Sequence, residues 1–240
     1  IQQQSKRPRA LIQQASDLLL YGDRNRMGIS DSGNSTTLTA ITLEDVKAFY
    51  EKYYSPHLSS VVVVGNLPRE EVIKKLGFLS QWQNKPYSIP PYDAFPEFSS
   101  PKIYLVNKPN STQSIVRLLK PFLPYDALGE QFRSSLMNFP LGGGFNSRIN
   151  LNLREDKGYS YGSKSRIMSG KTLGRITIGG AMNHVNTADA LAELFKEVDK
   201  YQKSGMTQDE LDFMRSAFTL GDALSYETPS DKAGFLQQLY

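Results

Sequence analysis

The sequence has no cysteine, only two histidines and no long apolar run. Without cysteine, disulfide scaffolds, thiolate zinc sites and cysteine nucleophiles are all excluded. Apolar runs such as Val61–Val64 fall far below the roughly 18 to 20 residues that a membrane-spanning helix requires. We therefore expect no transmembrane segment.

The two histidines limit the metal chemistry that the chain can carry. His57 and His184 each lack a second histidine three to five residues away, so no His-x-x-Glu-His or His-Glu-x-x-His zinc motif is present. Each is expected to be a surface or loop residue. A Gly-x-Ser-x-Gly elbow is also missing, which leaves a serine-triad hydrolase without support.

The composition is that of a folded protein. A hydrophobic fraction of 39% is too high for a disordered chain, and 22% charged residues are too many for an integral membrane protein. The net charge is +4, but no basic stripe with interleaved aromatic residues follows the cluster Lys6-Arg7-Arg9, so we expect no nucleic-acid partner. A cysteine-free chain suits an oxidising periplasm, and we predict that localisation. The first residue, Ile1, is typical of a mature product or a fragment.

The first 83 residues show helix and strand patterns. A capping-box pattern at Thr42–Asp45 predicts a helix over 42–54, and the β-branched run 60–65 predicts a strand buried on both faces. Further helices are expected over 9–21 and 68–76, with a loop over 22–39.

Prolines at five positions between 84 and 101 predict an extended connector, which we take as a domain boundary. The chain beyond it alternates strand and helix patterns: strands over 102–106 and 113–119, helices over 130–139 and 147–155, strands over 159–168 and 172–182, and helices around 188–198 and 211–218. This order predicts an α+β fold, with helices packed on one face of a largely antiparallel sheet.

The most specific segment runs from Leu141 to Tyr161 and begins with three glycines after a leucine. A phosphate-binding loop is not favoured, because no Gly-Lys-Ser/Thr ending follows. Glycines permit close packing and a sharp turn, and Asn146 or Ser147 could cap the next helix. We expect this packing role for the glycines.

This segment resembles the signature of the C-terminal, non-zinc-binding half of the M16 zinc metallopeptidases (the pitrilysin, insulinase and mitochondrial processing peptidase family). Leu-Gly-Gly-Gly, Ser-Arg and Leu-Arg-Glu-x-x-Gly-x-x-Tyr occur in the order typical of that family. The passage from Thr42 to Gly65 is similar to the end of an M16 repeat. The resemblance also offers a flexible-loop role in substrate entry for the glycines, but the stretch is shorter here and we favour the packing role. The resemblance implies that residues 1–83 are the C-terminal part of one repeat, 84–101 a proline-rich linker, and 102–240 a truncated domain of the Arg/Tyr-pair type.

The resemblance also implies a site. The zinc of the complete enzyme would be bound by a His-x-x-Glu-His motif outside this chain, while Arg154 and Tyr161 would contact the substrate carbonyl and stabilise its oxyanion. Arg154 is expected near a helix end, Gly158 would reverse the chain, and Tyr161 would lie on the returning strand. Without the resemblance, Arg154 would be a helix C-terminal cation paired with Glu155 or Asp156, and Tyr161 a sheet residue.

These expectations give one function and one alternative. The chain would be the non-zinc-binding portion of a periplasmic M16-like metalloendopeptidase, inactive alone and acting on peptides together with a zinc-bearing N-terminal half or subunit. Alternatively, it would be a non-catalytic structural or substrate-binding subunit. Either function is compatible with a homo-oligomer.

Two structural expectations accompany these readings. Sheet edges bind peptide as an added strand in this family, and the strand that begins at Thr172 is a candidate for that role. Because both repeats are incomplete, residues 1–80 are expected to pack against the second segment or a neighbouring chain.

Overall fold

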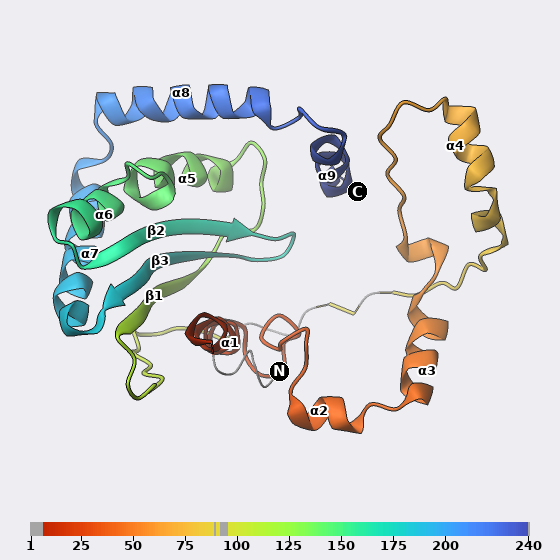
Figure 1. The fold of residues 1–240 in the computed structure, drawn as a ribbon, viewed down its shortest axis with the longest axis horizontal. Helices are drawn as coiled ribbons and strands as arrows, with labels where there is room; N and C mark the ends of the chain where they lie inside the picture. Colours follow the sequence, from red (N-terminus) through yellow and green to blue (C-terminus); the bar gives the residue numbers. More distant parts are fainter. Residues whose placement is uncertain (1–6, 89, 92–95, 240) are drawn as a thin grey trace. The chain divides into compact units, whose positions relative to one another are not determined.

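A computed structural model describes residues 7–88, 90–91 and 96–239 (Figure 1). The chain divides into two compact units: a sheet unit made of Ile1–Ser32 and Tyr92–Arg215, and a second unit made of Gly33–Pro91 and Ser216–Tyr240. Lys6 and the residues before it lie outside the described residues, so the structure does not test their predicted roles. No helix in the described ranges is long and apolar enough to cross a membrane.

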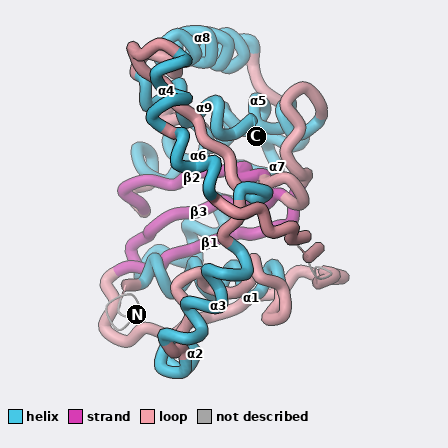
Figure 2. Tube along the Cα trace, turned by 90° about the vertical axis from the view of Figure 1, so that its right-hand side faces the viewer, coloured by secondary structure: helices cyan, strands magenta, loops and turns pink. Residues whose placement is uncertain are grey.

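The sheet unit is built on an antiparallel sheet. Its described strands are β1 (Gln113–Phe122), β2 (Ser160–Ser169) and β3 (Gly174–Asn183), in the order β1-β3-β2. Figure 2 shows these three strands side by side in magenta. The predicted strands over 113–119, 159–168 and 172–182 are therefore confirmed, as is the α+β fold class.

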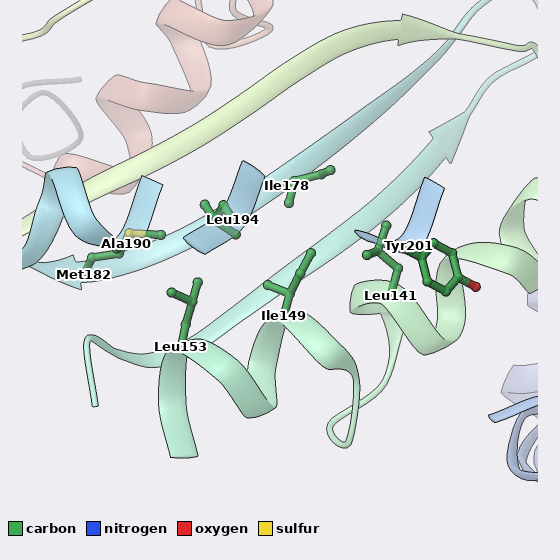
Figure 3. Close-up of a cluster of buried hydrophobic side chains, with 8 residues drawn as sticks. All are labelled: Leu141, Ile149, Leu153, Ile178, Met182, Ala190, Leu194 and Tyr201. Atoms are coloured by element: carbon green, nitrogen blue, oxygen red, sulfur yellow. The ribbon is translucent and has the colours of Figure 1, made fainter. Parts of the chain in front are cut away.

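Helices cover one face of this sheet (Figure 1). They are α5 (Glu130–Asn138) with the π-helical turn Phe139–Gly143, α6 (Arg148–Asn150) with the π-helical turn Leu151–Asp156, and α7 (Thr187–Ser204). Eight apolar residues from these elements and from β3 form the core (Figure 3): Leu141, Ile149, Leu153, Ile178, Met182, Ala190, Leu194 and Tyr201. The helices predicted over 130–139, 147–155 and around 188–198 are confirmed, the second as α6 and the π-helical turn that follows it.

One helix packs on the opposite face of the sheet. α1 (Pro8–Tyr21) supplies Gln13, whose Oε1 accepts a hydrogen bond of 2.8 Å from Arg117 of β1, and Asp17, which pairs with Arg175 of β3. Successive side chains on a strand point to opposite faces, so these arginines alternate with the core residues of the same strands. Polar contacts therefore attach α1 to the sheet.

The second unit is mostly helical. It contains α2 (Ser35–Ala40), α3 (Leu43–Tyr53), α4 (Arg69–Lys75), α9 (Pro229–Leu239), and the end of α8 (Gln208–Leu224). The capping box of α3 forms as predicted: Asp45 N–H donates to Thr42 Oγ1 (3.2 Å) and Thr42 N–H donates to the Asp45 carboxylate (2.8 Å). α2 corrects the loop predicted over 22–39, and α9 was not predicted.

Two predicted strands do not form. Residues 60–65 and 102–106 have no regular structure, and Ile103 and Leu105 are 99% and 90% exposed. A β-strand needs hydrogen bonds to a neighbour, and no described strand pairs with either segment. The prediction that 60–65 is buried on both faces is wrong, since Val61 and Val63 are exposed. Within residues 1–80, α1 packs on the sheet, whereas Val61 and Val63 are exposed in this single chain. Their covering by a neighbouring chain stays a prediction.

The proline-rich segment 84–101 contains no helix or strand in its described part, while residue 89 and residues 92–95 lie outside it. Its beginning is attached to the end of α3, because Lys85 N–H donates to the buried Ser55 Oγ (2.8 Å) and Tyr87 packs edge-on against Tyr53. The boundaries between the two compact units fall after residues 32, 91 and 215, whereas the predicted domain boundaries were at 83 and 101. The assignment of 1–83 and 102–240 to two repeats stays a prediction.

Candidate functional site

Arg154 and Tyr161 lie together on the surface of the sheet unit. The Arg154 Cζ atom is 5.2 Å from the centroid of the Tyr161 ring and 4.7 Å from that of the Phe145 ring. The three side chains come from the π-helical turn Leu151–Asp156, from β2 and from the loop before α6. Phe145 was not predicted as part of the site. The one signal for it is its place inside the motif, directly after the glycines.

The backbone between Arg154 and Tyr161 explains how these two residues meet. Lys157 N–H donates to Asn152 O (3.0 Å) and Tyr159 N–H donates to Leu153 O (2.9 Å), which closes the end of the π-helical turn. Gly158 has φ +65°, a conformation that favours glycine, and reverses the chain into β2. The turn predicted at Gly158 is confirmed.

Tyr161 occupies a β-bulge. Ser160 pairs with Met182 and Gly162 with Ala181, so Tyr161 is the extra residue on β2. Ser160 is buried and its Oγ donates to Ala181 O (2.8 Å), whereas Tyr161 is 86% exposed. A bulge redirects side chains locally, and here it leaves the tyrosine ring on the surface beside Arg154.

The glycines place Phe145 through close packing. A Cβ atom on Gly142 would lie 2.5 Å from Ser165 Cβ, so only glycine lets this turn approach β2 so closely. This close approach supports the packing role of the glycines over the flexible-loop role. Ser147 occupies the N-cap position of α6, but neither it nor Asn146 caps the helix with its side chain, which corrects the predicted cap.

Among the described residues, Arg154 makes one ion pair. Its Nε is 3.3 Å from Glu155 Oε1, so the pairing expected without the resemblance is also present. The Arg154 and Glu155 side chains are 29% and 52% exposed, and such surface pairs contribute roughly 0 to 1 kcal/mol. The two terminal nitrogens of Arg154 make no hydrogen bond to any described residue. The site therefore presents guanidinium and phenol donors to solvent, a combination that suits a carbonyl or carboxylate acceptor.

The histidines belong to other surfaces. His57 and His184 are both exposed, as predicted, and His184 Nδ1 donates to Thr112 O at 3.1 Å. Within the described ranges, no three or more side chains of His, Asp or Glu converge as metal ligands would. These residues therefore do not fit a zinc ion.

The sheet edges differ from the expectation. β3, which begins at Gly174 just after Thr172, is the central strand and pairs with β1 on one side and β2 on the other. It therefore offers no edge to a peptide. In the described part of the chain, the open edges belong to β1 and to β2, and β2 carries Tyr161.

Comparison with family models decides the family. The model described as the peptidase M16 inactive domain matches residues 40–218. The chain belongs to the peptidase M16 family. In this M16 chain the matched range contains Phe145, Arg154 and Tyr161, and it spans parts of both compact units.

Curated relatives of this M16 chain carry two kinds of name. A Helicobacter pylori protein named "Non-peptidase homolog YmxG" is 27% identical over 203 residues, which cover 83% of this chain and 46% of the relative. A Streptomyces coelicolor protein named "Uncharacterized zinc protease SCO5738" is 23% identical over 199 residues, covering 80% and 42%. The M16 chain thus spans a little less than half the length of these relatives.

Solved structures show the same fold. The peptidase M16 inactive domain from Pseudomonas fluorescens superposes with a TM-score of 0.82 at 23% identity, covering 98% of this M16 chain and 55% of that chain. The periplasmic protease PqqL from Escherichia coli superposes with a TM-score of 0.70 at 14% identity, covering 97% and 27%. At these identities the likeness establishes the fold of the M16 chain.

Proposed function

We propose that this chain is the non-zinc-binding portion of a periplasmic M16 zinc peptidase, and that Arg154 and Tyr161 contact the carbonyl oxygen of a peptide substrate. The observation that carries the proposal is the convergence of the two side chains, one from a helix end and one from a bulged strand. The Arg154 Cζ atom lies 5.2 Å from the centroid of the Tyr161 ring. Zinc would be held by another segment or subunit, since the described residues here do not fit it.

The chemistry of the pair supports this role. A peptide carbonyl gains negative charge as its carbon is attacked, and fixed donors aimed at that oxygen stabilise the charge. The guanidinium offers N–H donors in a plane, and the exposed phenol offers one O–H. Because the interaction strengthens as charge develops, it lowers the barrier more than it tightens substrate binding.

A second candidate is a non-catalytic M16 subunit that binds peptide without cleaving it. The name of the Helicobacter pylori relative, a non-peptidase homolog, favours it. In that case the same donors would hold a peptide carbonyl or carboxylate, and the complete protein would lack turnover of any peptide.

The test is Tyr161→Phe in the complete protein. We expect kcat for peptide hydrolysis to fall roughly 10- to 1000-fold, the range for losing one oxyanion donor, with a smaller change in KM. The ring is kept and Tyr161 is 86% exposed, so the midpoint of thermal unfolding should not change. Steady-state kinetics on a panel of unstructured peptides measures both constants.

The result separates the two candidates. Wild-type kcat in a well-folded Tyr161→Phe protein would contradict the proposed contact. A complete wild-type protein that cleaves no peptide, but binds peptides less tightly after Tyr161→Phe, would instead establish the non-catalytic subunit.

A further inference from the structure

Asn150 lies beneath the site and touches both segments that carry its aromatic rings. Its side chain is buried, with 3% of the residue exposed. The amide Nδ2 donates to Phe145 O (2.8 Å), and Oδ1 accepts from Ser163 N–H (3.2 Å). A single buried amide therefore joins the loop before α6 to β2.

The two bonds end next to the aromatic residues. One holds the backbone of Phe145 itself, and the other holds β2 two residues beyond Tyr161, just past the bulge. Arg154 follows Asn150 by four residues, about one helical turn along the same segment. The segments that carry all three side chains thus meet at one buried residue.

The contacts among Phe145, Arg154 and Tyr161 are too weak to fix these three side chains by themselves. Phe145 and Tyr161 are 62% and 86% exposed, and a cation–π contact at an exposed position is weak. A buried side chain bonded to two backbone groups restricts both segments more strongly, because breaking either bond leaves a buried polar atom without a partner.

We infer that Asn150 is a positioning residue that sets the distance between the Phe145 and Tyr161 rings and so holds Arg154 in place. The positioning of the two rings and of Arg154 does not depend on the proposed function, whereas the effect of Asn150 on turnover rests on it. Because Asn150 is buried, this role acts through the two segments it joins.

Asn138 provides a matched control. It is also a buried asparagine, 6% exposed, and it also makes two hydrogen bonds, but both are to β2: its Nδ2 donates to Ser165 O (3.0 Å) and its Oδ1 accepts from Ser165 Oγ. These bonds lie further along the strand and involve neither Phe145 nor Tyr161. Replacing either asparagine by alanine should lower the unfolding temperature to a similar extent.

The experiment compares Asn150→Ala and Asn138→Ala in the complete protein labelled with ¹⁵N-arginine. The Arg154 Nε–H resonance, assigned through its loss in Arg154→Lys, reports the ring currents of the adjacent aromatic residues. We expect Asn150→Ala to move this resonance toward the position of an exposed arginine and to lower kcat roughly 10- to 100-fold. Asn138→Ala should leave the resonance in place and kcat within about twofold of the wild type.

An unchanged Arg154 resonance in Asn150→Ala, or an equal shift in Asn138→Ala, would overturn the inference. A shifted resonance with wild-type kcat would uphold the positioning role and contradict the proposed function instead. Should Asn150→Ala fail to fold, Asn150→Asp keeps the acceptor for Ser163 N–H but places a carboxylate oxygen against Phe145 O in place of the donor, and it should shift the same resonance.

Discussion

The helical segment Arg148–Asp156 carries an arginine near each end, and the two lie in opposite environments. Each guanidinium carbon is 4.7 Å from the centroid of an aromatic ring, Tyr201 for Arg148 and Phe145 for Arg154. Arg148 also binds Glu210 through Nε (2.5 Å) and Nη2 (2.7 Å), and donates to Gly205 O (3.0 Å). Arg154 has one exposed carboxylate at 3.3 Å.

The difference shows what each arginine does. The bonds of Arg148 tie α6 to the start of α8 and to the loop before it, so its donors serve the fold. Arg154 leaves its terminal nitrogens without a described partner, so these two nitrogens are available to a ligand. The residue type is the same, and the surrounding tertiary contacts decide the role.

The largest expected effect is on stability at Arg148. We expect Arg148→Ala to lower the free energy of unfolding by about 2 to 4 kcal/mol, because Glu210 loses its partner in a largely buried pair. Urea unfolding followed by circular dichroism measures the change. Arg154→Ala is the control, and a loss at Arg154 equal to that at Arg148 would remove the distinction between the two arginines.

A smaller effect is the pH dependence of the Arg148–Glu210 pair. Hydrogen bonds from Arg148 lower the pKa of Glu210, while the bond to Glu210 raises the pKa of Arg148. An acid whose pKa is depressed in the folded state stabilises the protein above its unfolded pKa of about 4.3, and this stabilisation disappears as pH falls through the folded pKa. The stability difference between wild type and Glu210→Gln should therefore be constant above about pH 5 and shrink below pH 4.3. A difference that does not change down to pH 2.5 would show that the pair has no such linkage.

The smallest effect is expected at the partner of Arg154. Glu155→Gln should change the free energy of unfolding by less than about 0.5 kcal/mol, because the pair is exposed and screened by water. Thermal unfolding at low and high salt checks this. A loss above about 1 kcal/mol would mean that Arg154 belongs to the fold, as Arg148 does.

The sequence predicts the elements that local signals specify. The capping box at Thr42 begins a helix where expected, and the approach of Tyr161 to Arg154 follows from the helix end and Gly158. α9 had a comparable signal that was missed, since Thr228 and Asp231 form the same reciprocal hydrogen bonds.

The remaining features depend on contacts between distant residues. The runs 60–65 and 102–106 have strand composition, yet a strand forms only beside a partner, and composition does not reveal whether one is present. Phe145 joins the site through the tight approach of Gly142 to Ser165, and Asn150 through bonds to two separate segments. Neither contact leaves a periodic pattern in the sequence.

The most direct test of the account is a paired measurement on Arg148→Lys and Arg154→Lys in the complete protein. Lysine keeps the charge but lacks the planar fork of donors in both variants. For each variant, the unfolding midpoint is compared with kcat per folded molecule. We predict that Arg148→Lys lowers the midpoint and leaves kcat near the wild-type value, whereas Arg154→Lys leaves the midpoint unchanged and lowers kcat at least roughly 10-fold. Wild-type kcat in a folded Arg154→Lys protein would contradict the central claim.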